Sequence, residues 1–411
     1  MSSGFGPANT VFTDLLKYSK KPQAAEGEIR TQVVPSYNKS QFSPSETMLF
    51  TIPTRRPNQV LNGRQSYLKM TLNNPDLNTL AMDYTADSII ENLELFHGSN
   101  MVEQIRTYNA LSCFVKDFQG SKNVQAMLEG EHETTARTGA TVTASGGSIT
   151  VCLPILSGVI GTMSPYFFPA YACTAGDLRL ELTLASQVAG VVHDTAASAW
   201  TVSSPELHLE YIQLTPAAIA KLPKEMEFSF ETFENVSATI PSGTANEYTL
   251  VPFSLGSVKA LYSIYRFTSN MSSPTAKTVS NRPNPQLAEW QYEIGGVQYP
   301  PAPIKSTEET FAEILKAQHA LGVVDELVQV KKSQYELTTA AATDAAFVLG
   351  IDLEYLTGAG SRAKSGVDTR GKDVFLNQKW SSATGQAYRL DSFAHCDATL
   401  KISNGQISVS K

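Results

Sequence analysis

The feature of this sequence that most constrains its fold is a long internal repeat. One segment carries apolar residues at the i, i+3, i+4 and i+7 positions of a single helix face: Leu111, Phe114, Val115 and Phe118. A second segment repeats this spacing at a constant offset of 200 residues: Phe311, Ile314, Leu315 and Gln318. The capping box Ser306-Thr307-Glu308-Glu309 precedes the second segment and favours a helix start there. We therefore expect two helices in equivalent positions of two copies of one domain.

Further segments keep the same order and almost the same spacing in both halves. A hairpin-like sequence precedes each helix, at residues 93–100 (LELFHGSN) and 290–297 (WQYEIGGV). Other matching pairs lie 191 to 200 residues apart: Phe50–Pro53 with Leu250–Phe253, Asn74 with Asn270, Val151 with Phe347, Leu178 with Val374, and Leu207 with Ala398. A period this long exceeds that of a solenoid or a propeller blade, so it predicts two tandem domains. Two unrelated β domains that share their strand spacing are the alternative.

Strand signals dominate both halves. Short runs rich in β-branched, aromatic and leucine residues recur between Gly, Pro, Asn and Ser, as they do in β-sandwiches. The clearest runs are 48–52, 67–72, 149–153, 178–184, 207–214, 248–253, 260–267, 347–355 and 398–402. The sequence therefore predicts an all-β protein in which helices are few and short.

The sequence between the two halves predicts a rigid connection. Residues 215–223 (TPAAIAKLP) begin with Thr and Pro and end with a second Pro, which is typical of a short helical linker. The predicted organisation is an N-terminal arm at 1–45, a first β domain at 46–215, a linker at 216–228 and a second β domain at 229–411.

The first 45 residues differ from the rest of the chain. They carry one short amphipathic face made of Val11, Phe12, Leu15, Leu16 and Tyr18, followed by a polar run. We interpret this segment as an arm that packs on a neighbouring molecule, because no core of its own is available to it. A disordered terminus is the alternative.

Composition excludes several classes of protein. Charged residues make up 17% of the 411 residues, where about 25% is usual, so we expect neighbours to cover part of the surface. The net charge of −7 argues against nucleic-acid binding by the folded body, which needs clustered Lys and Arg.

We find neither a membrane-spanning apolar run nor a secretory leader. Four widely spaced cysteines, Cys113, Cys152, Cys173 and Cys396, are therefore expected to be free thiols.

No arrangement of reactive residues indicates catalysis. The six histidines fall in no metal-binding or nucleophile–base motif: His97, His132, His193, His208, His319 and His395. In His395-Cys396-Asp397 the cysteine should point to the opposite face of the strand from its neighbours, so the three cannot form a relay. We predict no catalytic, cofactor-binding or metal-binding residue, and no enzyme activity. The scattered histidines also argue against a cupin-like enzyme.

Two other motifs have a simple interpretation. The acidic run Glu129-Gly130-Glu131-His132-Glu133 lacks the ligand spacing of a calcium loop, and we interpret it as a solvated loop. Residues 358–363 (GAGSRA) match a dinucleotide-binding pattern, but no helix pattern follows to bind a pyrophosphate, so a flexible loop is expected. Trp200, Trp290 and Trp380 are more typical of a core than of a glycan-binding platform.

One segment has an unusual composition. The 39 residues from Thr138 to Gly176 carry no charge. A strand pair accounts for only about a dozen to twenty of them. Because the centres of subunit interfaces are depleted of charge, we expect the remainder to contact a partner subunit. A buried strand pair with a neutral loop is the alternative.

The arrangement resembles that of the double jelly-roll major capsid proteins of the adenovirus, tectivirus, virophage and polinton-like virus lineage. The resemblance rests on the two hairpins with their following helices, and on the strand-like run 207–214 (LHLEYIQL) that leads through the linker into 228–233 (FSFETF). It covers residues 46–411. It implies two tandem eight-stranded jelly rolls joined by a helical linker. The large tower insertions of adenovirus hexons have no counterpart here.

The resemblance also implies a function. The chain would form homotrimeric, pseudo-hexameric capsomers that tile an icosahedral shell in the virion of a DNA virus. Its partners would be further copies of itself and minor capsid or penton proteins, with an internal membrane as an open possibility and no cofactor. A trimeric receptor- or glycan-binding viral spike of jelly-roll type is the alternative.

Overall fold

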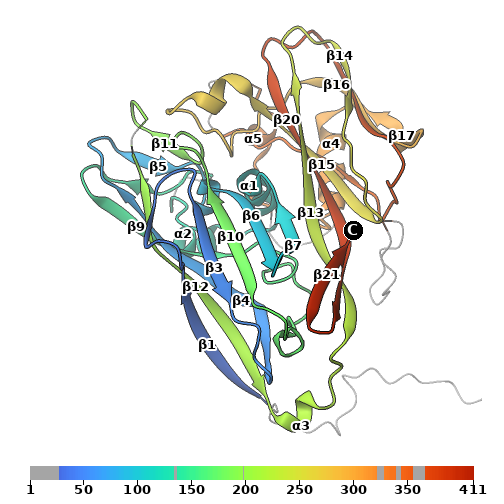
Figure 1. Cartoon of the computed structure of the whole chain (residues 1–411). Coiled ribbons are helices and arrows are strands. Elements are labelled where there is room, and N and C mark those ends of the chain that lie inside the picture. Colours follow the sequence, from blue (N-terminus) through green and yellow to red (C-terminus); the bar gives the residue numbers. More distant parts are fainter. Residues whose placement is uncertain (1–26, 134–136, 198, 322–327, 339–343, 355–365) are drawn as a thin grey trace, which may run out of the picture.

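The computed structural model describes residues 27–133, 137–197, 199–321, 328–338, 344–354 and 366–411. In these ranges the chain forms two β-sandwiches side by side, with a short helix at the end where they are joined (Figure 1). The first sandwich is complete before the second begins. The prediction of an all-β fold is confirmed.

The first sandwich consists of two antiparallel sheets, with strand orders β1-β12-β4-β9 and β3-β10-β6-β7. The strands of the first sheet are β1 (Gly27–Pro35), β12 (Thr201–Leu214), β4 (Gln59–Asn74) and β9 (Gly147–Pro154). Those of the second sheet are β3 (Thr47–Ile52), β10 (Leu178–Leu184), β6 (Ile90–His97) and β7 (Asn100–Ile105). The short strand β2 (Gln41–Phe42) also pairs with β12, beyond the end of β1.

The second sandwich repeats this arrangement, with strand orders β13-β20-β15-β18 and β14-β19-β16-β17. The strands of its first sheet are β13 (Met226–Ile240), β20 (Tyr388–Ser403), β15 (Val258–Phe267) and β18 (Leu349–Asp352). Those of its second sheet are β14 (Asn246–Leu250), β19 (Val374–Trp380), β16 (Leu287–Ile294) and β17 (Val297–Ile304). The C-terminal strand β21 (Gln406–Ser410) pairs with β20.

The two sandwiches have the same topology. If the eight main strands of each are numbered along the chain, both give sheets of order 1-8-3-6 and 2-7-4-5. This is a jelly roll, in which eight strands form two facing antiparallel sheets. The predicted pair of tandem eight-stranded jelly rolls is confirmed, and we call them the first and second roll.

The two helices that revealed the repeat occupy equivalent connections. Helix α1 (Tyr108–Gln119) follows β7, and helix α4 (Thr307–Ala317) follows β17, the fifth strand of each roll. A two-residue turn precedes each fifth strand, and Gly98 and Gly295 adopt positive φ angles of 61° and 57° in these turns. The capping box forms at α4, because the Ser306 hydroxyl accepts from Glu309 N at 3.1 Å and the Glu309 carboxylate accepts from Ser306 N at 3.3 Å.

The remaining elements are short. A small sheet of order β11-β5-β8 extends the first roll. The elements are β5 (Leu80–Met82), β8 (Thr141–Val142), β11 (Val191–His193), α2 (Lys122–Leu128), α3 (Pro216–Ile219) and α5 (Lys332–Tyr335), with 3₁₀ turns at Ala86–Ile89, Ala170–Ala172 and Thr268–Ser272. Within the described ranges, no helix has the length and apolar character needed to cross a bilayer.

Burial differs between equivalent strands of the two rolls. Along β4 of the first roll, buried residues such as Leu68 and Met70 alternate with partly exposed ones, as in a sheet with one solvated face. All ten residues of β15, the equivalent strand of the second roll, are buried. The outer face of this sheet is therefore covered, by helix α1 of the first roll and by helix α4 of the second roll.

A short helix lies between the last strand of the first roll and the first strand of the second. Helix α3 is the predicted linker helix, and its N-cap Thr215 accepts a hydrogen bond from Ala218 N at 3.2 Å. Strand β13 then begins at Met226. Residues 27–35 of the predicted arm form β1 and pair with β12 along their whole length, so they belong to the first roll. The apolar face of the arm, at residues 11–18, lies outside the described residues.

All four thiols are free, but they differ in exposure. Cys113, Cys173 and Cys396 are buried, whereas Cys152 is partly exposed on β9. Burial raises the pKa of Cys173 and of Cys396 to about 12. Since the thiolate is the reactive form, these buried groups should be inert in the native protein.

We therefore expect a thiol titration to count four cysteines in denaturant without reductant, and only Cys152 in the native state. A Cys152→Ser variant should abolish the native signal and leave three thiols in denaturant. A denatured count below four in the wild-type protein would show disulfide bonds and contradict this prediction.

Candidate functional site

The junction between the two rolls is the most elaborate set of contacts in the described structure. Helix α1 and strand β7 of the first roll face strands β13, β15 and β20 of the second. Phe114 of α1 packs on Tyr262 and Phe393, with ring centroids 5.2 and 5.7 Å apart. Phe118, one turn further along, contacts Phe311 of α4 at 6.3 Å. Because α1 packs on the outer face of this sheet, both faces of β15 are buried.

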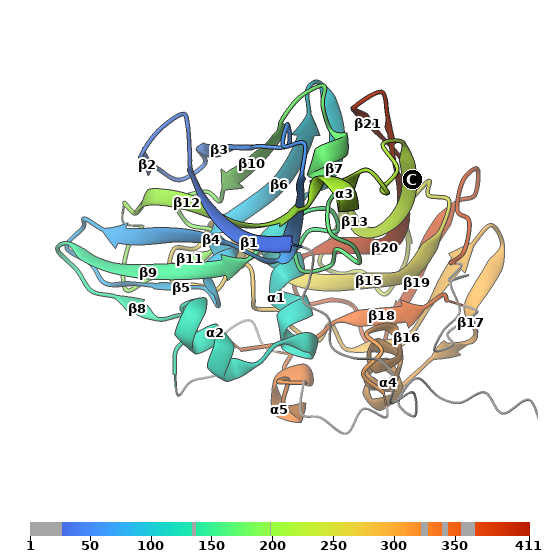
Figure 2. The same cartoon turned by 90° about the horizontal axis from the view of Figure 1, so that it is seen from below.

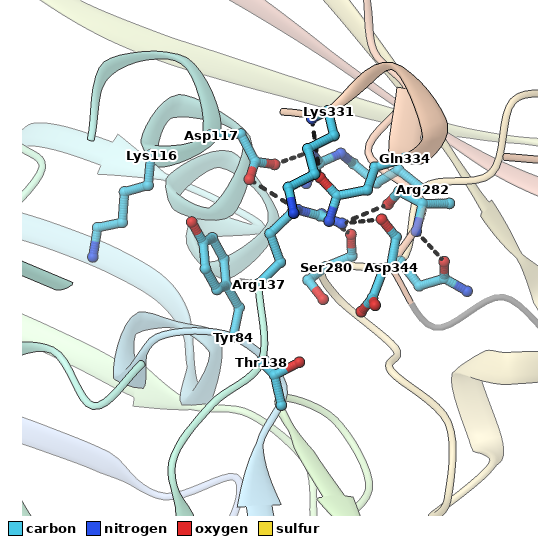
Figure 3. A network of polar contacts seen from close by, with 12 residues as sticks. Tyr84, Lys116, Asp117, Arg137, Thr138, Ser280, Arg282, Lys331, Gln334 and Asp344 are labelled. Atoms are coloured by element: carbon cyan, nitrogen blue, oxygen red, sulfur yellow. Dashed lines mark hydrogen bonds and ion pairs between the residues drawn. The ribbon is translucent and has the colours of Figure 1, made fainter. Parts of the chain in front are cut away.

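A buried ion network crosses this junction beside the aromatic residues (Figure 3). Asp117 of α1 accepts from Arg137 Nε at 2.9 Å, and its second carboxylate oxygen binds Arg282 of the second roll. All three side chains have no exposed surface. One carboxylate of the first roll therefore neutralises guanidinium groups from both rolls.

Arg137 extends the network to the backbone of the second roll. Its two terminal nitrogens donate to the carbonyls of Asp344 at 2.6 Å, Ala345 at 3.0 Å and Ser280 at 2.6 Å. The Lys277 ammonium of the second roll donates to the Arg137 carbonyl at 2.5 Å and forms an ion pair with Asp344 at 2.8 Å. These bonds are charge-assisted, so each is stronger than a bond between neutral groups.

Asp83 anchors the same loop of the second roll from another side. Its carboxylate accepts from Val279 N at 2.7 Å and from the Ser280 hydroxyl at 2.5 Å. The segment 277–282 is thus bound by Asp83, Asp117 and Arg137, all of which belong to the first roll. This segment cannot move relative to the first roll without breaking buried polar contacts.

A second polar centre joins the rolls at β7. Glu103 is fully buried, and its carboxylate accepts from Gly158 N at 2.9 Å, from the Thr232 hydroxyl of β13 at 3.0 Å and from the Ser157 hydroxyl. Burial raises the pKa of Glu103, although these hydrogen bonds oppose the shift. A Cβ atom at Gly158 would lie 1.9 Å from the Glu231 carbonyl oxygen. Only glycine allows the loop to approach β13 this closely.

The part of the charge-free segment 138–176 that follows β9 lies at this junction, because this loop contacts the second roll and the linker, whereas β8 and β9 pair within the first roll. The Tyr171 hydroxyl donates to the Pro223 carbonyl at 2.9 Å, and Ala175 N donates to the Gly405 carbonyl at 3.3 Å. Tyr166 packs edge-on against Phe228 at 5.8 Å. The expected partner surface is therefore in large part the second roll of the same chain, so the composition does not require another subunit here.

A cleft of about 570 Å³ opens between the rolls beside α1. Three of the charged groups at the cleft form ion pairs with one another or with Glu354: Lys259 with Glu231 at 2.5 Å and with Glu354 at 3.3 Å, and His395 with Glu231 at 3.1 Å. The hydrogen bond from His395, together with Lys259, holds the pKa of Glu231 far below its usual range. This cluster is a third set of ionic contacts at the junction.

The histidines singled out from the sequence are dispersed. His97 bonds to Gly176, His193 to Gln187, His208 stacks on Tyr67, and His319 pairs with Glu354. His395 and Asp397 bond to Glu231 and Ser257, while Cys396 lies on the opposite, buried side. In the described part of the chain, no three His, Cys, Asp or Glu residues are placed to bind a metal ion. The three tryptophans are buried, and residues 358–363 lie outside the described residues.

The acidic run 129–133 is not a solvated loop, and this prediction is wrong. Glu129 is buried and pairs with Lys116 at 2.6 Å. Glu131 is buried and accepts from Arg137 N at 2.8 Å. Only Glu133 is exposed. The carboxylates turn inward because Lys116 and the Arg137 backbone supply partners that the local sequence does not reveal.

Sequence reasoning missed the Asp117 network. Its members are separated by 20 residues (Asp117 to Arg137) and 165 residues (Asp117 to Arg282), and no motif connects them. The one available signal was Asp117 itself, which lies between Val115 and Phe118 in the apolar helix segment. A charge beside an apolar helix face indicates a possible buried ion pair.

Each roll also has a strand surface that corresponds to one used in the junction by the other roll. Neither of these two surfaces is covered within the described chain. The contact inside the chain joins β7 of the first roll to β13 of the second. The equivalents of these strands are β17 of the second roll and β1 of the first. Val297 on β17 is 54% exposed, and Ile29 and Val33 on β1 are 66% and 47% exposed. Each copy therefore presents two apolar strand surfaces whose counterparts are buried against each other.

No protein-family model and no curated protein matches this sequence. Solved structures match along the whole chain. A chain of the PBCV-1 virus capsid aligns with a TM-score of 0.66 at 14% identity, covering 95% of this chain and 99% of that one. The Faustovirus major capsid protein gives 0.65 at 11% identity, with 96% and 93% covered. The Sputnik virophage structure gives 0.63 at 12% identity, with 100% and 94% covered. The chain has the double jelly-roll fold found in these capsid structures.

Removal of the Asp117 charge from the ion network should destabilise the protein strongly. Asp117→Asn keeps the shape of the side chain but leaves Arg137 and Arg282 without a neutralising group. We expect a loss of about 3 to 5 kcal/mol in the free energy of unfolding, measured by urea denaturation. Asp368→Asn, which removes an exposed partner of Arg370, serves as the control and should leave the midpoint unchanged. Equal effects of the two variants would contradict this assignment.

Glu131 should make stability depend on pH. Burial raises the pKa of Glu131 to about 7, from a reference value of 4.5. The protonated form is thus favoured in the folded state, and its contribution to stability is lost as the pH rises from about 4.5 to 7. Glu131→Gln should therefore become more stable than the wild-type protein by about 1 to 3 kcal/mol above pH 7. The exposed Glu133→Gln control should show no such pH-dependent difference in thermal or urea unfolding.

Proposed function

We propose that this chain is a structural major capsid protein that forms homotrimeric, pseudo-hexameric capsomers in an icosahedral virion. The observation that carries the proposal is the pair of rolls with identical topology, aligned over nearly the full length of chains from virus capsids. A shell subunit needs extended contacts between copies and no reaction chemistry. The spike alternative has no comparable support, because the matched structures described above are capsids or major capsid proteins.

The internal geometry supports assembly into a closed ring. The contact between the rolls is heterologous, because it joins different surfaces, the β7 side of one roll and the β13 side of the other. A heterologous contact that repeats between copies forms a ring when the rotation closes. In this protein the exposed β17 surface of one copy can contact the exposed β1 surface of the next, in the same way as β7 contacts β13 within the chain. Three chains would then place six similar rolls around one axis.

The character of the edge strands agrees with a specific contact. Strand β17 contains Pro300, Pro301 and Pro303, which cannot donate backbone hydrogen bonds. The prolines oppose the pairing of a further strand with this edge. Contact at this surface should therefore come from side chains such as Val297. Prolines in this strand favour a defined, closed assembly over fibre formation.

We further propose the partners, the segment boundaries and the location that the sequence predicts. Its partners are neighbouring copies of the chain and minor capsid proteins, and the folded body does not bind nucleic acid. The rolls and the linker follow the boundaries 46–215, 216–228 and 229–411, with β1 added to the first roll. The protein is located in the capsid of the virion, and its function needs no enzyme activity and no cofactor.

Electron microscopy and light scattering of the purified protein test the function together. We expect particles with a three-fold axis and a pseudo-hexagonal outline, with a mass three times 44.6 kDa. Projecting fibres would support a spike. A monomer at micromolar concentration would contradict the capsomer proposal.

The ring contact can be tested by charge substitutions on the two exposed surfaces. Val297→Asp and Val33→Asp each place a charge in the proposed interface, so we expect each to shift the protein from trimer to monomer in light scattering. Leu77→Asp is the control, because Leu77 is 82% exposed but lies outside both surfaces. Circular dichroism should show the same β content in all variants. A trimer that survives both interface substitutions would contradict the proposed contact.

A further inference from the structure

Three large apolar side chains are exposed at the end of the molecule that carries the linker. Tyr166 and Phe167 are 60% and 55% exposed, and Leu222 is 38% exposed. We call these three residues the linker-end patch. Adjacent exposed aromatic residues are costly in water, so a patch of this kind indicates a binding surface.

The patch is held together by contacts between two segments. The loop 164–171 contacts the linker where the Tyr171 hydroxyl donates to the Pro223 carbonyl at 2.9 Å, and it contacts the start of strand β13 where Tyr166 packs on Phe228. The neighbouring residue Phe168 is anchored to the first roll, since its backbone forms two hydrogen bonds of 2.8 Å with Leu61 of β4. The exposed side chains therefore stand on a rigid base.

The described chain begins beside this patch. Gly27, the first residue of β1, pairs with Leu214, which immediately precedes the N-cap residue of the linker helix α3. Figures 1 and 2 both show the start of β1 next to α3. The 26 preceding residues are therefore attached to the molecule next to the linker-end patch.

Those preceding residues contain an apolar sequence of suitable size. Val11, Phe12, Leu15 and Leu16 have the spacing of one short helix face, and they are separated from the rolls by a polar run. Ten residues lie between Leu16 and Gly27, and the eleven Cα–Cα steps that they make can span at most about 40 Å. Covalent attachment at this distance gives a high effective concentration at the patch.

We propose that the segment 11–16 of the N-terminal arm docks on the linker-end patch, with Phe12 against Phe167. This contact covers the exposed linker-end patch with an apolar sequence of the same chain, and it gives the arm a defined position at the linker end. It does not depend on the proposed capsid function, because both partners belong to this polypeptide.

Limited proteolysis of the full-length protein tests the docking. Trypsin can cleave after Lys17 and Lys20, next to the proposed docked segment. Cleavage requires the segment to open, so its rate follows the population of the open form. Phe167→Asp should increase the rate at these sites about tenfold, which corresponds to about 1.4 kcal/mol of lost contact. Met127→Asp is the matched control, since Met127 is 84% exposed on α2, and it should leave the rate unchanged.

A double-variant cycle makes the test specific. Phe12→Asp should increase the cleavage rate as much as Phe167→Asp, and the double variant should show no further increase if the two residues contact each other. Independent, multiplying effects would overturn the proposal, as would a wild-type rate in Phe167→Asp. Dissociation of an oligomer by Phe167→Asp in light scattering would also overturn it, because Phe167 would then belong to a subunit contact.

Discussion

The structure depends on one buried carboxylate, that of Asp117, which lies between guanidinium groups from both rolls. A charge without exposed surface is tolerated only when it is neutralised and hydrogen-bonded. Asp117 therefore specifies one relative position of the two rolls, because a shift would leave Arg137 or Arg282 unpaired in an apolar environment. The aromatic contacts of Phe114 supply apolar burial at the same place, but they are less directional.

The proposed ring of several copies requires a fixed angle between the rolls. If the two rolls could rock, the exposed β1 and β17 surfaces would have no constant geometry, and a ring of several copies would not close reliably. Glu103 and Gly158 reinforce the same arrangement at β7, where a carboxylate and a close backbone approach fix the loop against β13. The buried polar groups of the junction thus determine the relative orientation of the two rolls more than they add to the free energy of unfolding.

The repeat and the strand pattern sufficed to predict the fold, because hairpin turns, helix caps and alternating strands are local signals. Ser306 with Glu309, and the glycines at 98 and 295, show this directly. The junction was not predictable in the same way. Asp117 and Arg282 are 165 residues apart, and the inward turn of Glu129 depends on Lys116 of a neighbouring helix. Such contacts arise only when the two rolls are placed together, so no sequence window contains them.

The charge-free segment shows how composition can identify a kind of surface but not its partner. Its missing charges predicted a covering unit, expected to be a partner subunit, because charged residues are depleted where water is excluded. That unit is in large part the second roll of the same chain, as the contacts of Tyr171 and Ala175 show. In a protein built from two similar rolls, an interface within the chain and one between chains obey the same physical rules. The sequence of one interface therefore resembles that of the other, and only the three-dimensional arrangement distinguishes them.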